Sequence, residues 1–380
     1  MSAPRIPFNR PSLEGKELEY VQAAIEGGHS AGDGPFTRRC SELLESWVGG
    51  SRALLTTSCT HALEMCALLL DIKEGDEVIV PSFAFVTTAG AFALHGAKPV
   101  FVDIRPDTLN LDENQLREKI TTRTRAIVVL HYGGIACEMD TIQAISQETG
   151  VPIVEDNAHG LLGSYRGQPL GSFGCLATQS FHETKNFICG EGGALLINRE
   201  AWVDRAEILR EKGTDRSRFL RGQVDKYTWV DIGSSYLPSE ILAAFLLAQL
   251  EARETIQQRR HQIWQRYQAE LQGWAGQQGI ALPHVPENCS HPSHLFYLIL
   301  PSAESRRRLI EHLGEEGILA VFHYQSLHLS EMGQKFGGRP GQCPVTESVS
   351  DQLLRLPLYC GLTESEQSQT IERVLSFSAG

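Results

Sequence analysis

The sequence predicts an α/β protein with a large domain, built on a mostly parallel sheet covered by helices on both faces, and a smaller C-terminal α+β domain. Between residues 51 and 198, short apolar runs alternate with helical stretches, which is typical of βαβ units. A proline-containing connector at 283–292 precedes a second strand, helix and strand pattern. The length of 380 residues fits two or three packing units of roughly 150 residues each.

The strands of the first domain are predicted from apolar runs that end in polar residues. The expected strands cover residues 52–55, 78–80, 99–102, 126–130, 152–154 and 177–181, with a further strand at 192–198 that follows the turn Gly190-Glu-Gly-Gly193 and closes the sheet. Helices are expected at 62–70, which is apolar on every face, and at 112–120, which begins with an Asp cap.

The second domain is predicted to begin where a long helix leaves the first. Apolar residues at helical spacing predict a helix over about 238–271, and the later pattern predicts a strand at 294–300, a helix at 303–313 and a strand at 318–322. We therefore place the large domain at residues 1–250 and the small domain at 251–380.

Composition excludes several classes of protein. Lys and Arg number 34 against 46 Asp and Glu, and the resulting net charge of −12 disfavours a nucleic-acid partner, because phosphate backbones need a cationic surface. No apolar run approaches the roughly 20 residues of a membrane span, and no apolar leader opens the sequence, so we expect a cytoplasmic protein. The nine cysteines form no Cys-x-x-Cys pair and are expected to be reduced.

A run of small hydroxyl residues follows the first predicted strand. Thr56-Thr-Ser-Cys-Thr-His61 leads directly into the helix expected at 62–70. A helix N-terminus presents free N–H groups, so this turn is suited to a phosphate group. Ordinary N-capping by Ser or Thr explains the same pattern equally well.

Two more polar groups follow strands of the same sheet. Asp156 and His159 follow the strand at 152–154. A buried carboxylate there needs a cationic partner, although helix capping is the commoner role. Lys185, in Ser180-Phe-His-Glu-Thr-Lys-Asn186, lies between a strand and a glycine turn. Desolvation of its amine would lower the pKa and make it a nucleophile toward carbonyls, whereas a solvated loop lysine would be inert.

The three groups together indicate one cofactor. Ligands of open α/β sheets bind beyond the carboxyl ends of the strands, where all three groups are expected to meet. An anion cradle, a carboxylate and an amine are the groups that pyridoxal 5′-phosphate (PLP) requires. Phe85 could stack on its ring, although Phe83 or core packing explains that pattern too.

The sequence contains a basic stretch and several histidines outside these groups. Residues 212–226 gather cations, including Lys226, that could receive a diphosphate, although a solvated loop is the commoner explanation. His291 with His294, and His323 with His328, lack a clustered third ligand, so no metal site is predicted.

Jointly these motifs resemble the DegT/DnrJ/EryC1/StrS aminotransferases over residues 6–375. The resemblance rests on the segment 180–186 with Gly190-Glu-Gly-Gly193, on Glu155-Asp-Asn-Ala-His159, and on Pro81-Ser-Phe-Ala-Phe85 beyond the turn at 57–60. It implies the aspartate-aminotransferase fold (PLP fold type I) and a homodimer with active sites at the interface. Lysine at 185 also argues against dehydratases of the same fold, which carry histidine there.

The resemblance also implies roles for single residues. Lys185 matches the Schiff-base lysine and Asp156 the partner of the pyridinium nitrogen, while His159 lies beside the ring hydroxyl and Phe85 stacks on the ring. The phosphate cradle matches Ser180, Thr60 and the backbone of His61. Contacts to the sugar nucleotide are expected from Lys226, Tyr324 and His328.

One position departs from the family pattern. Many members have Gly-Tyr-Asn-Tyr-Arg where this chain has Gly233-Ser-Ser-Tyr-Leu237, and that Asn reaches the cofactor phosphate of the neighbouring subunit. Ser235 occupies its place with a shorter side chain, which puts the contact in doubt.

The substrates are expected from a narrower similarity. Residues 32–39, 101–108 and 221–229 are most similar to members that use L-glutamate and a dTDP-sugar, dTDP-4-keto-6-deoxy-D-glucose. Transfer to the 3-position, transfer with the opposite C4 stereochemistry, and a PLP-binding sensor without turnover stay open as alternatives.

Overall fold

The computed structural model describes residues 5–50 and 52–379. Residues 1–4, on which the expectation of no leader partly rests, and residue 51, where the alternating pattern begins, lie outside the described residues. Within the described part, no helix combines the length and the apolar character needed to cross a membrane.

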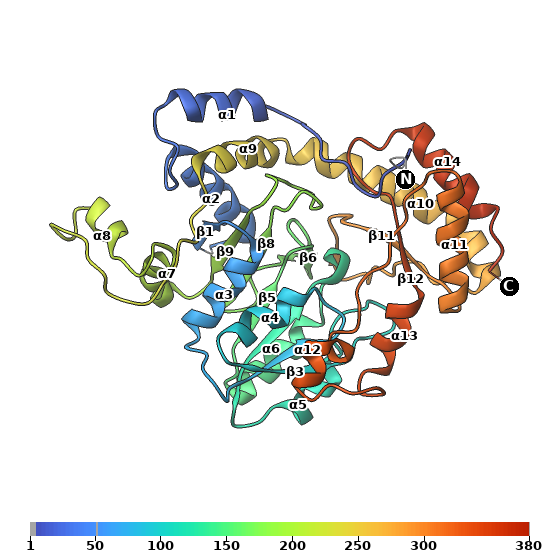
Figure 1. The fold of residues 1–380 in the computed structure, drawn as a ribbon, viewed down its shortest axis with the longest axis horizontal. Helices are drawn as coiled ribbons and strands as arrows, with labels where there is room; N and C mark the ends of the chain where they lie inside the picture. The colour runs from blue at the N-terminus through green and yellow to red at the C-terminus, as the bar shows by residue number, and fades with distance from the viewer. Residues whose placement is uncertain (1–4, 51, 380) are drawn as a thin grey trace.

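A seven-stranded sheet forms the centre of the molecule (Figure 1). Its strands are β1 (Arg52–Thr56), β2 (Glu77–Pro81), β3 (Lys98–Val102), β4 (Thr124–Leu130), β5 (Ile153–Asp156), β8 (Leu176–Ser180) and β9 (Gly193–Ile197), in the spatial order β1-β9-β8-β5-β4-β2-β3. The pairs among β3, β2, β4, β5 and β8 are parallel, and β9 runs antiparallel to both its neighbours. The mostly parallel sheet is confirmed. The expectation that residues 192–198 close it is wrong, because β9 lies between β8 and β1.

Helices cover both faces of this sheet. One face packs against α3 (Cys59–Leu69), α4 (Val86–Leu94) and α7 (Val203–Arg210). The other face packs against α2 (Pro35–Val48) and α9 (Glu240–Glu251) at the β1 side, and against α5 (Leu116–Lys119) and α6 (Met139–Thr149) at the β3 side. Residues of β4 alternate between the two cores: Val128 joins the first, and Ile127 and Val129 join the second. This period of two explains why an entirely apolar strand is stable between two helical layers.

The remaining elements extend this body. They are α1 (Glu17–Glu26), α8 (Arg216–Leu220), the short strands β6 (Ser164–Tyr165), β7 (Gln168–Pro169) and β10 (Cys289–Ser290), and the 3-10 turns η1 (Glu113–Gln115), η2 (Tyr132–Gly134), η3 (Glu200–Trp202) and η4 (Leu327–Leu329). The expected Asp cap is present, since the Asp112 side chain accepts a hydrogen bond from the Asn114 N–H at the start of η1. In Figure 1, α8 projects from the left of the body on an extended loop.

The C-terminal layer is built on a two-stranded antiparallel sheet. It comprises α10 (Arg253–Gln278), β11 (Phe296–Ile299), α11 (Ala303–Glu315), α12 (Glu331–Lys335), α13 (Pro344–Gln352), β12 (Leu353–Leu356) and α14 (Glu364–Leu375). Ile6, near the start of the chain, packs into the apolar cluster of this layer. The boundary after residue 250 stays a prediction.

Two expectations for this region are wrong. The helix expected over 238–271 is two helices, α9 and α10, separated at Ala252. Residues 318–322 form no strand: Ile318 and Val321 make single bridges, to Ile6 and Arg355, while β12 takes the position beside β11. An apolar run becomes a strand only where a partner offers a continuous ladder of backbone groups.

A buried carboxylate joins two helices of the first domain. Glu240, at the start of α9, is fully buried, and its carboxylate accepts hydrogen bonds from the N–H groups of Gly34 (3.0 Å), Phe36 (2.8 Å) and Thr37 (3.0 Å). These are donors of the first turn of α2, which has no side-chain cap of its own. Glu240 therefore caps a helix distant in sequence.

Removal of this cap should destabilise the fold. We expect Glu240→Ala to lower the free energy of unfolding by about 3 kcal/mol, because three buried N–H groups lose their acceptor. Urea denaturation followed by circular dichroism measures the change. Glu254→Ala, at a side chain that is 90% exposed, is the control and should be neutral. A Glu240→Ala variant as stable as the control would contradict this role.

Candidate active site

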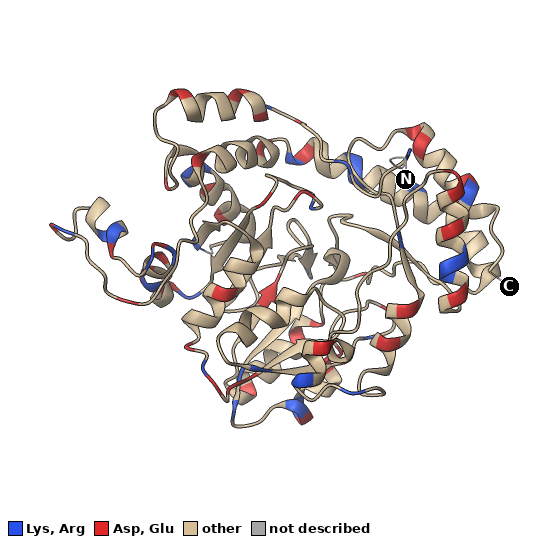
Figure 2. Ribbon diagram, viewed as in Figure 1, with Lys and Arg blue, Asp and Glu red and all other residues tan. Residues whose placement is uncertain are grey.

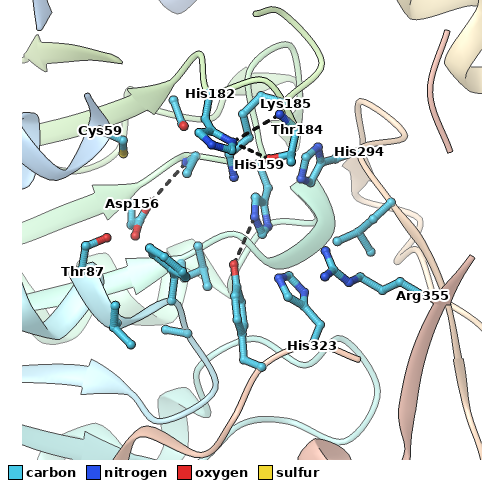
Figure 3. A pocket seen from close by; sticks show the side chains of 18 of the residues that line it. Cys59, Thr87, Asp156, His159, His182, Thr184, Lys185, His294, His323 and Arg355 are labelled. Atoms are coloured by element: carbon cyan, nitrogen blue, oxygen red, sulfur yellow. Dashed lines mark hydrogen bonds between the residues drawn. The ribbon is translucent and has the colours of Figure 1, made fainter. Parts of the chain in front are cut away.

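The carboxyl ends of β5 and β8, the start of α3 and the C-terminal layer enclose one cavity of about 820 Å³. Figure 3 shows the side chains that line it. Seven of the residues expected from the sequence lie on its wall: Thr60, Phe85, Asp156, His159, Ser180, Lys185 and Tyr324. The residues come from segments up to 264 positions apart, from Thr60 to Tyr324, and the sheet brings them together.

The turn before α3 presents free backbone donors. Ser58 is the N-cap of α3, and its hydroxyl accepts a hydrogen bond from the His61 N–H at 3.1 Å. In the described structure, the N–H groups of Cys59 and Thr60 and the hydroxyl groups of Thr60 and Ser180 make no hydrogen bond. Capping and anion binding are therefore compatible in this turn, because the cap uses one N–H and leaves two.

A glycine allows β9 to approach this turn closely. A Cβ atom on Gly193 would lie 2.4 Å from the backbone of Ser58 and Cys59, so no larger residue fits without displacing the turn. The glycine expected from sequence to form a turn therefore also places the anion-binding N–H groups beside β8.

Asp156 is the carboxylate of the cavity. It is 3% exposed, and it accepts hydrogen bonds from the hydroxyl of Thr88 (2.7 Å) and the N–H of Ala158 (3.3 Å). Burial raises the pKa of Asp156, while the Thr88 bond and the nearby Lys185 amine lower it. Its neighbour Glu155 points to the other face of β5, where the N–H groups of Gly171, Phe173 and Gly174 bind its carboxylate. The alternation of β5 therefore assigns the cavity to Asp156 alone.

Lys185 lies in the loop between β8 and β9. Burial lowers the pKa of its amine to about 8, and the positive charge of Arg355 acts in the same direction, while Cys59 and Asp156 act against it. At pH 7 about a tenth of this amine is therefore uncharged and nucleophilic, far more than for an ordinary lysine.

Histidine and tyrosine side chains form the wall opposite the turn. The Gly133 N–H donates to Nδ1 of His159 (3.3 Å), so Nε2 carries the proton and faces the Tyr324 hydroxyl at 3.3 Å. Burial lowers the pKa of His159, which keeps the ring neutral. The His294 ring stacks on His159 with centroids 4.3 Å apart. Phe85 is 55% exposed at the mouth of the cavity.

Four predicted site residues do not line this cavity. His328 is fully buried between the Ser82 hydroxyl (2.6 Å) and the Glu347 carboxylate (3.0 Å), so the expected substrate contact is wrong for this structure, and His328 supports the wall from behind. The His61 N–H is used by the α3 cap, and its ring contacts Tyr236. Lys226 and Ser235 are exposed near the projecting α8 segment.

The basic stretch beside α8 is largely neutralised by ion pairs. Arg216 contacts Glu211 (2.8 Å), Arg218 contacts Asp204 (2.9 Å), and Arg221 contacts Glu207 (2.7 Å) and Asp204 (3.7 Å). Figure 2 shows the same mixture of basic and acidic residues elsewhere, as along α11. In this structure these three arginines therefore behave as residues of an ordinary solvated loop and not as a free cationic site.

Sequence reasoning missed several residues of the cavity. Thr88 holds Asp156 from α4, and Arg355 enters the wall from β12. Thr88 carried no signal, because nothing in the local sequence distinguishes it from its neighbour Thr87. Arg355 did carry one: it interrupts the apolar run Leu353-Leu-Arg-Leu-Pro-Leu358, where a charge needs a reason.

These features fit the cofactor that the sequence indicated. Free N–H and hydroxyl groups at the turn suit a phosphate, Asp156 suits a protonated ring nitrogen, and the Lys185 amine suits a covalent bond to an aldehyde. Fold and site together define a PLP-dependent aminotransferase of the aspartate-aminotransferase fold.

Comparison with known proteins leads to the same class. A family model described as the DegT/DnrJ/EryC1/StrS aminotransferase family matches residues 11–375, and the chain belongs to this family. The chain is 30% identical to the spore coat polysaccharide biosynthesis protein SpsC of Bacillus subtilis, over 99% of this chain and 97% of SpsC.

Solved structures show the same fold. The aminotransferase TlmJ from Streptoalloteichus hindustanus superimposes with a TM-score of 0.89 at 29% identity, covering 98% of each chain. Spr1654 from Streptococcus pneumoniae, solved in a PMP-form, gives 0.89 at 28% identity, covering 97% of this chain and 98% of that one. Spr1654 is also known in a PLP-form, and PLP is the cofactor of this chain.

The reactivity of Lys185 should depend on pH near neutrality. With apoprotein and added PLP, we expect the rate of covalent attachment to rise with pH to a midpoint near 8 and to fall at lower pH, because only the uncharged amine attacks. Stopped-flow absorbance at a series of pH values measures this rate. A midpoint near 10.5, the ordinary value for lysine, would show that the amine is solvated.

Proposed function

We propose that this protein transfers the amino group of L-glutamate to C4 of dTDP-4-keto-6-deoxy-D-glucose, giving dTDP-4-amino-4,6-dideoxy-D-galactose and 2-oxoglutarate. The observation that carries an aminotransferase function is the single cavity that Lys185, Asp156 and the free N–H groups of the α3 turn share. The sugar class is supported by the polysaccharide role named for SpsC. The particular substrate is supported by residues 32–39, 101–108 and 221–229, which resemble the transaminase of enterobacterial common antigen synthesis.

The residues of the cavity divide the work between them. Bound PLP supplies an electron sink and a temporary carrier for the amino group. Asp156 would hold the proton on the ring nitrogen, and the Thr88 hydroxyl orients the carboxylate. The amine of Lys185 would move the proton to and from the reacting carbon. Phe85 would cover the ring, and the N–H groups of the turn would hold the phosphate.

Product analysis tests the proposal. Holoenzyme is incubated with L-glutamate and dTDP-4-keto-6-deoxy-D-glucose, and NMR coupling constants of the product report the carbon that carries nitrogen and its configuration. An axial amine at C4 supports the proposal. An equatorial amine, a 3-amino product or turnover only with another keto sugar would replace the substrate while keeping the class. Bound PLP without turnover of any keto sugar would favour a sensor, although a sensor has no need to retain both Lys185 and Asp156.

We also propose a homodimer whose interface includes the projecting α8 segment. Apolar side chains on this segment are exposed in the single chain, Trp229 by 78%, together with Phe219, Leu220, Tyr227, Val230 and Ile232. A second copy of the chain would cover these side chains. Lys226 and Ser235 of one copy would then lie at the cavity of the other copy. Light scattering measures the molar mass of the wild type and of Trp229→Asp and so tests the homodimer. A monomeric wild type would contradict the homodimer.

The cytoplasm is the location we propose. All nine cysteines are free of disulfide bonds in the structure, which suits a reducing compartment. Fractionation of the native cells tests the location.

A further inference from the structure

His294 is a neutral imidazole on the wall of the cavity. It lies two residues before β11 and is 7% exposed. Burial lowers the pKa of His294, and the nearby charges of His159 and Lys185 would act in the same direction. Figure 3 shows the His294 ring beside His159 and near the Lys185 side chain. An uncharged imidazole in this position offers one hydrogen-bond donor and one acceptor.

The hydrogen bonds of Asn186 determine which nitrogen of His294 carries the proton. Asn186 Nδ2 donates to the carbonyl of Pro292 at 2.7 Å, and a carbonyl can only accept. Asn186 Oδ1 is therefore the atom that faces His294 Nδ1 at 2.9 Å, so Nδ1 carries the proton and donates it. His294 Nε2 keeps its lone pair, and no group of the described residues donates a hydrogen bond to it.

The backbone that carries His294 is held in an uncommon conformation. Ser293 is fully buried and has a φ of 50°, in the left-handed region that serine rarely adopts. Arg260 of α10 donates to the carbonyls of Ser293 (3.3 Å) and His294 (2.6 Å), and the Ser293 hydroxyl contacts Nδ1 of His261 at 2.6 Å. Such backbone persists only where several contacts enforce it, and it is typical of functional sites. The fold therefore fixes the place of the His294 ring.

A small recess of the cavity adjoins both His294 and Lys185. Its volume is about 10 Å³, and Gln179 and Asn186 also line it. This volume holds one small group, such as a water molecule or the nitrogen of an amine. Gln179 is 1% exposed, and its Nε2 is buried with no partner among the described residues, so the recess suits a polar occupant.

We propose that the recess receives the Lys185 amine when this amine is not bonded to the cofactor, and that His294 Nε2 accepts a hydrogen bond from it. The inference rests on the proposed role of Lys185, in which the amine leaves the cofactor and stays near the reacting carbon. Asn186 follows Lys185 in the chain, so its bond to His294 keeps the acceptor beside the lysine. His294 is therefore a positioning residue for the free amine.

His159, the other imidazole that lines the recess, does not offer this acceptor. Its Nδ1 accepts the N–H of Gly133 at 3.3 Å, and its Nε2 faces the hydroxyl of Tyr324 at 3.3 Å. A water molecule is the competing occupant, because it would use the same lone pair of His294. The lysine amine is tethered at the recess by its own side chain, so it loses less translational freedom there than a free water molecule.

The first test is a crystal structure of the wild-type protein with its cofactor as PMP, which has no aldehyde to bond to Lys185. We expect Lys185 Nζ within about 3.2 Å of His294 Nε2. A water molecule in the recess, with Lys185 Nζ elsewhere, would overturn the proposal.

The second test measures the Lys185 amine in apoprotein, without turnover. The rate of covalent attachment of added PLP is followed over pH in His294→Phe, which keeps a flat ring but has no acceptor, and in His294→Gln, which restores an acceptor atom. His291→Phe is the matched control. His291 lies in the same segment and accepts a hydrogen bond from the Ser293 N–H at 3.3 Å, but it does not line the cavity.

We expect His294→Phe to move the midpoint of attachment about one pH unit below that of the wild type, because the charged amine loses an acceptor. His294→Gln should recover part of this difference, and His291→Phe should keep the wild-type midpoint. The other charged and titratable groups that act on Lys185 are unchanged in these variants: Cys59, Asp156, His159, His323 and Arg355.

An unchanged midpoint in folded His294→Phe would also overturn the proposal, and so would an equal change in His291→Phe. If His294→Phe does not fold, His294→Leu takes its place against His294→Gln, and the structure with PMP needs no variant. Covalent attachment of PLP to Lys185→Ala would instead contradict the proposed role of Lys185. Neither test uses a keto sugar, so a wrong sugar in the proposed function would leave both intact.

Discussion

Lys185→Ala is expected to lose at least about 10⁴-fold in kcat while still binding PLP through the other cavity residues. The amine both attaches the cofactor and moves the proton, so a methyl group removes two roles at once. Burial holds its pKa near 8, which keeps part of the amine uncharged at working pH. Absorbance of the purified protein before and after glutamate, together with steady-state turnover, measures the loss.

Covalent attachment gives an independent readout. After borohydride reduction, the wild type should retain the cofactor mass on the peptide that contains Lys185, and the variant should not. Lys73→Ala, which changes an exposed lysine far from the cavity, should behave as wild type. A Lys185→Ala protein that keeps the wild-type absorbance band and turnover would show that another group bonds the cofactor.

Asp156→Asn is expected to reduce kcat by about 10³-fold with little effect on folding. The amide is nearly isosteric with the carboxylate, but it cannot hold a positive charge on the ring nitrogen, and the electron sink weakens. Burial raises the pKa of Asp156 in the empty cavity, but the positive charge of a protonated ring nitrogen would oppose that shift, so the loss in Asp156→Asn should be present at every pH at which the wild type is active. Steady-state rates over a range of pH values measure this loss.

Two variants calibrate this result. Thr88→Val removes the hydroxyl that orients Asp156 at 2.7 Å, and it should cost only a few-fold to tenfold in kcat, as one neutral donor to a charged group. Asp351→Asn, at an exposed position outside the cavity, should be neutral. Equal losses in Thr88→Val and Asp156→Asn would mean that the carboxylate acts through position alone and not through its charge.

Much of the site was predictable because each residue stands at a recognisable place in a local pattern. Asp156 and Ser180 end apolar strands, Lys185 precedes a glycine turn, and Thr60 opens a helix. The carboxyl ends of parallel strands meet at one sheet edge, so side chains at these ends converge without knowledge of the tertiary structure. The same reasoning identified the fold class.

The errors arose where a distant partner decides the outcome. His328 lies in a polar segment that suggested a substrate contact, but Ser82 and Glu347, remote in sequence, enclose it fully. Residues 318–322 have a strand-like composition, but β12 rather than this run pairs with β11. The composition of a segment does not show which of two strand-like segments pairs with β11.

The class of fold, the cofactor and seven residues of the cavity wall follow from the amino-acid sequence, because strand periodicity and strand-end chemistry are local properties of the chain. Which charged groups meet depends on the folded arrangement. It turned Asp156 to the cavity and Glu155 to the backbone of 171–174, paired the arginines around α8 with acids of α7 and its neighbours, and placed no acidic side chain of the described residues in an ion pair with Arg355. The free energy of a charge depends on the groups folded around it, and those groups come from segments far apart in sequence.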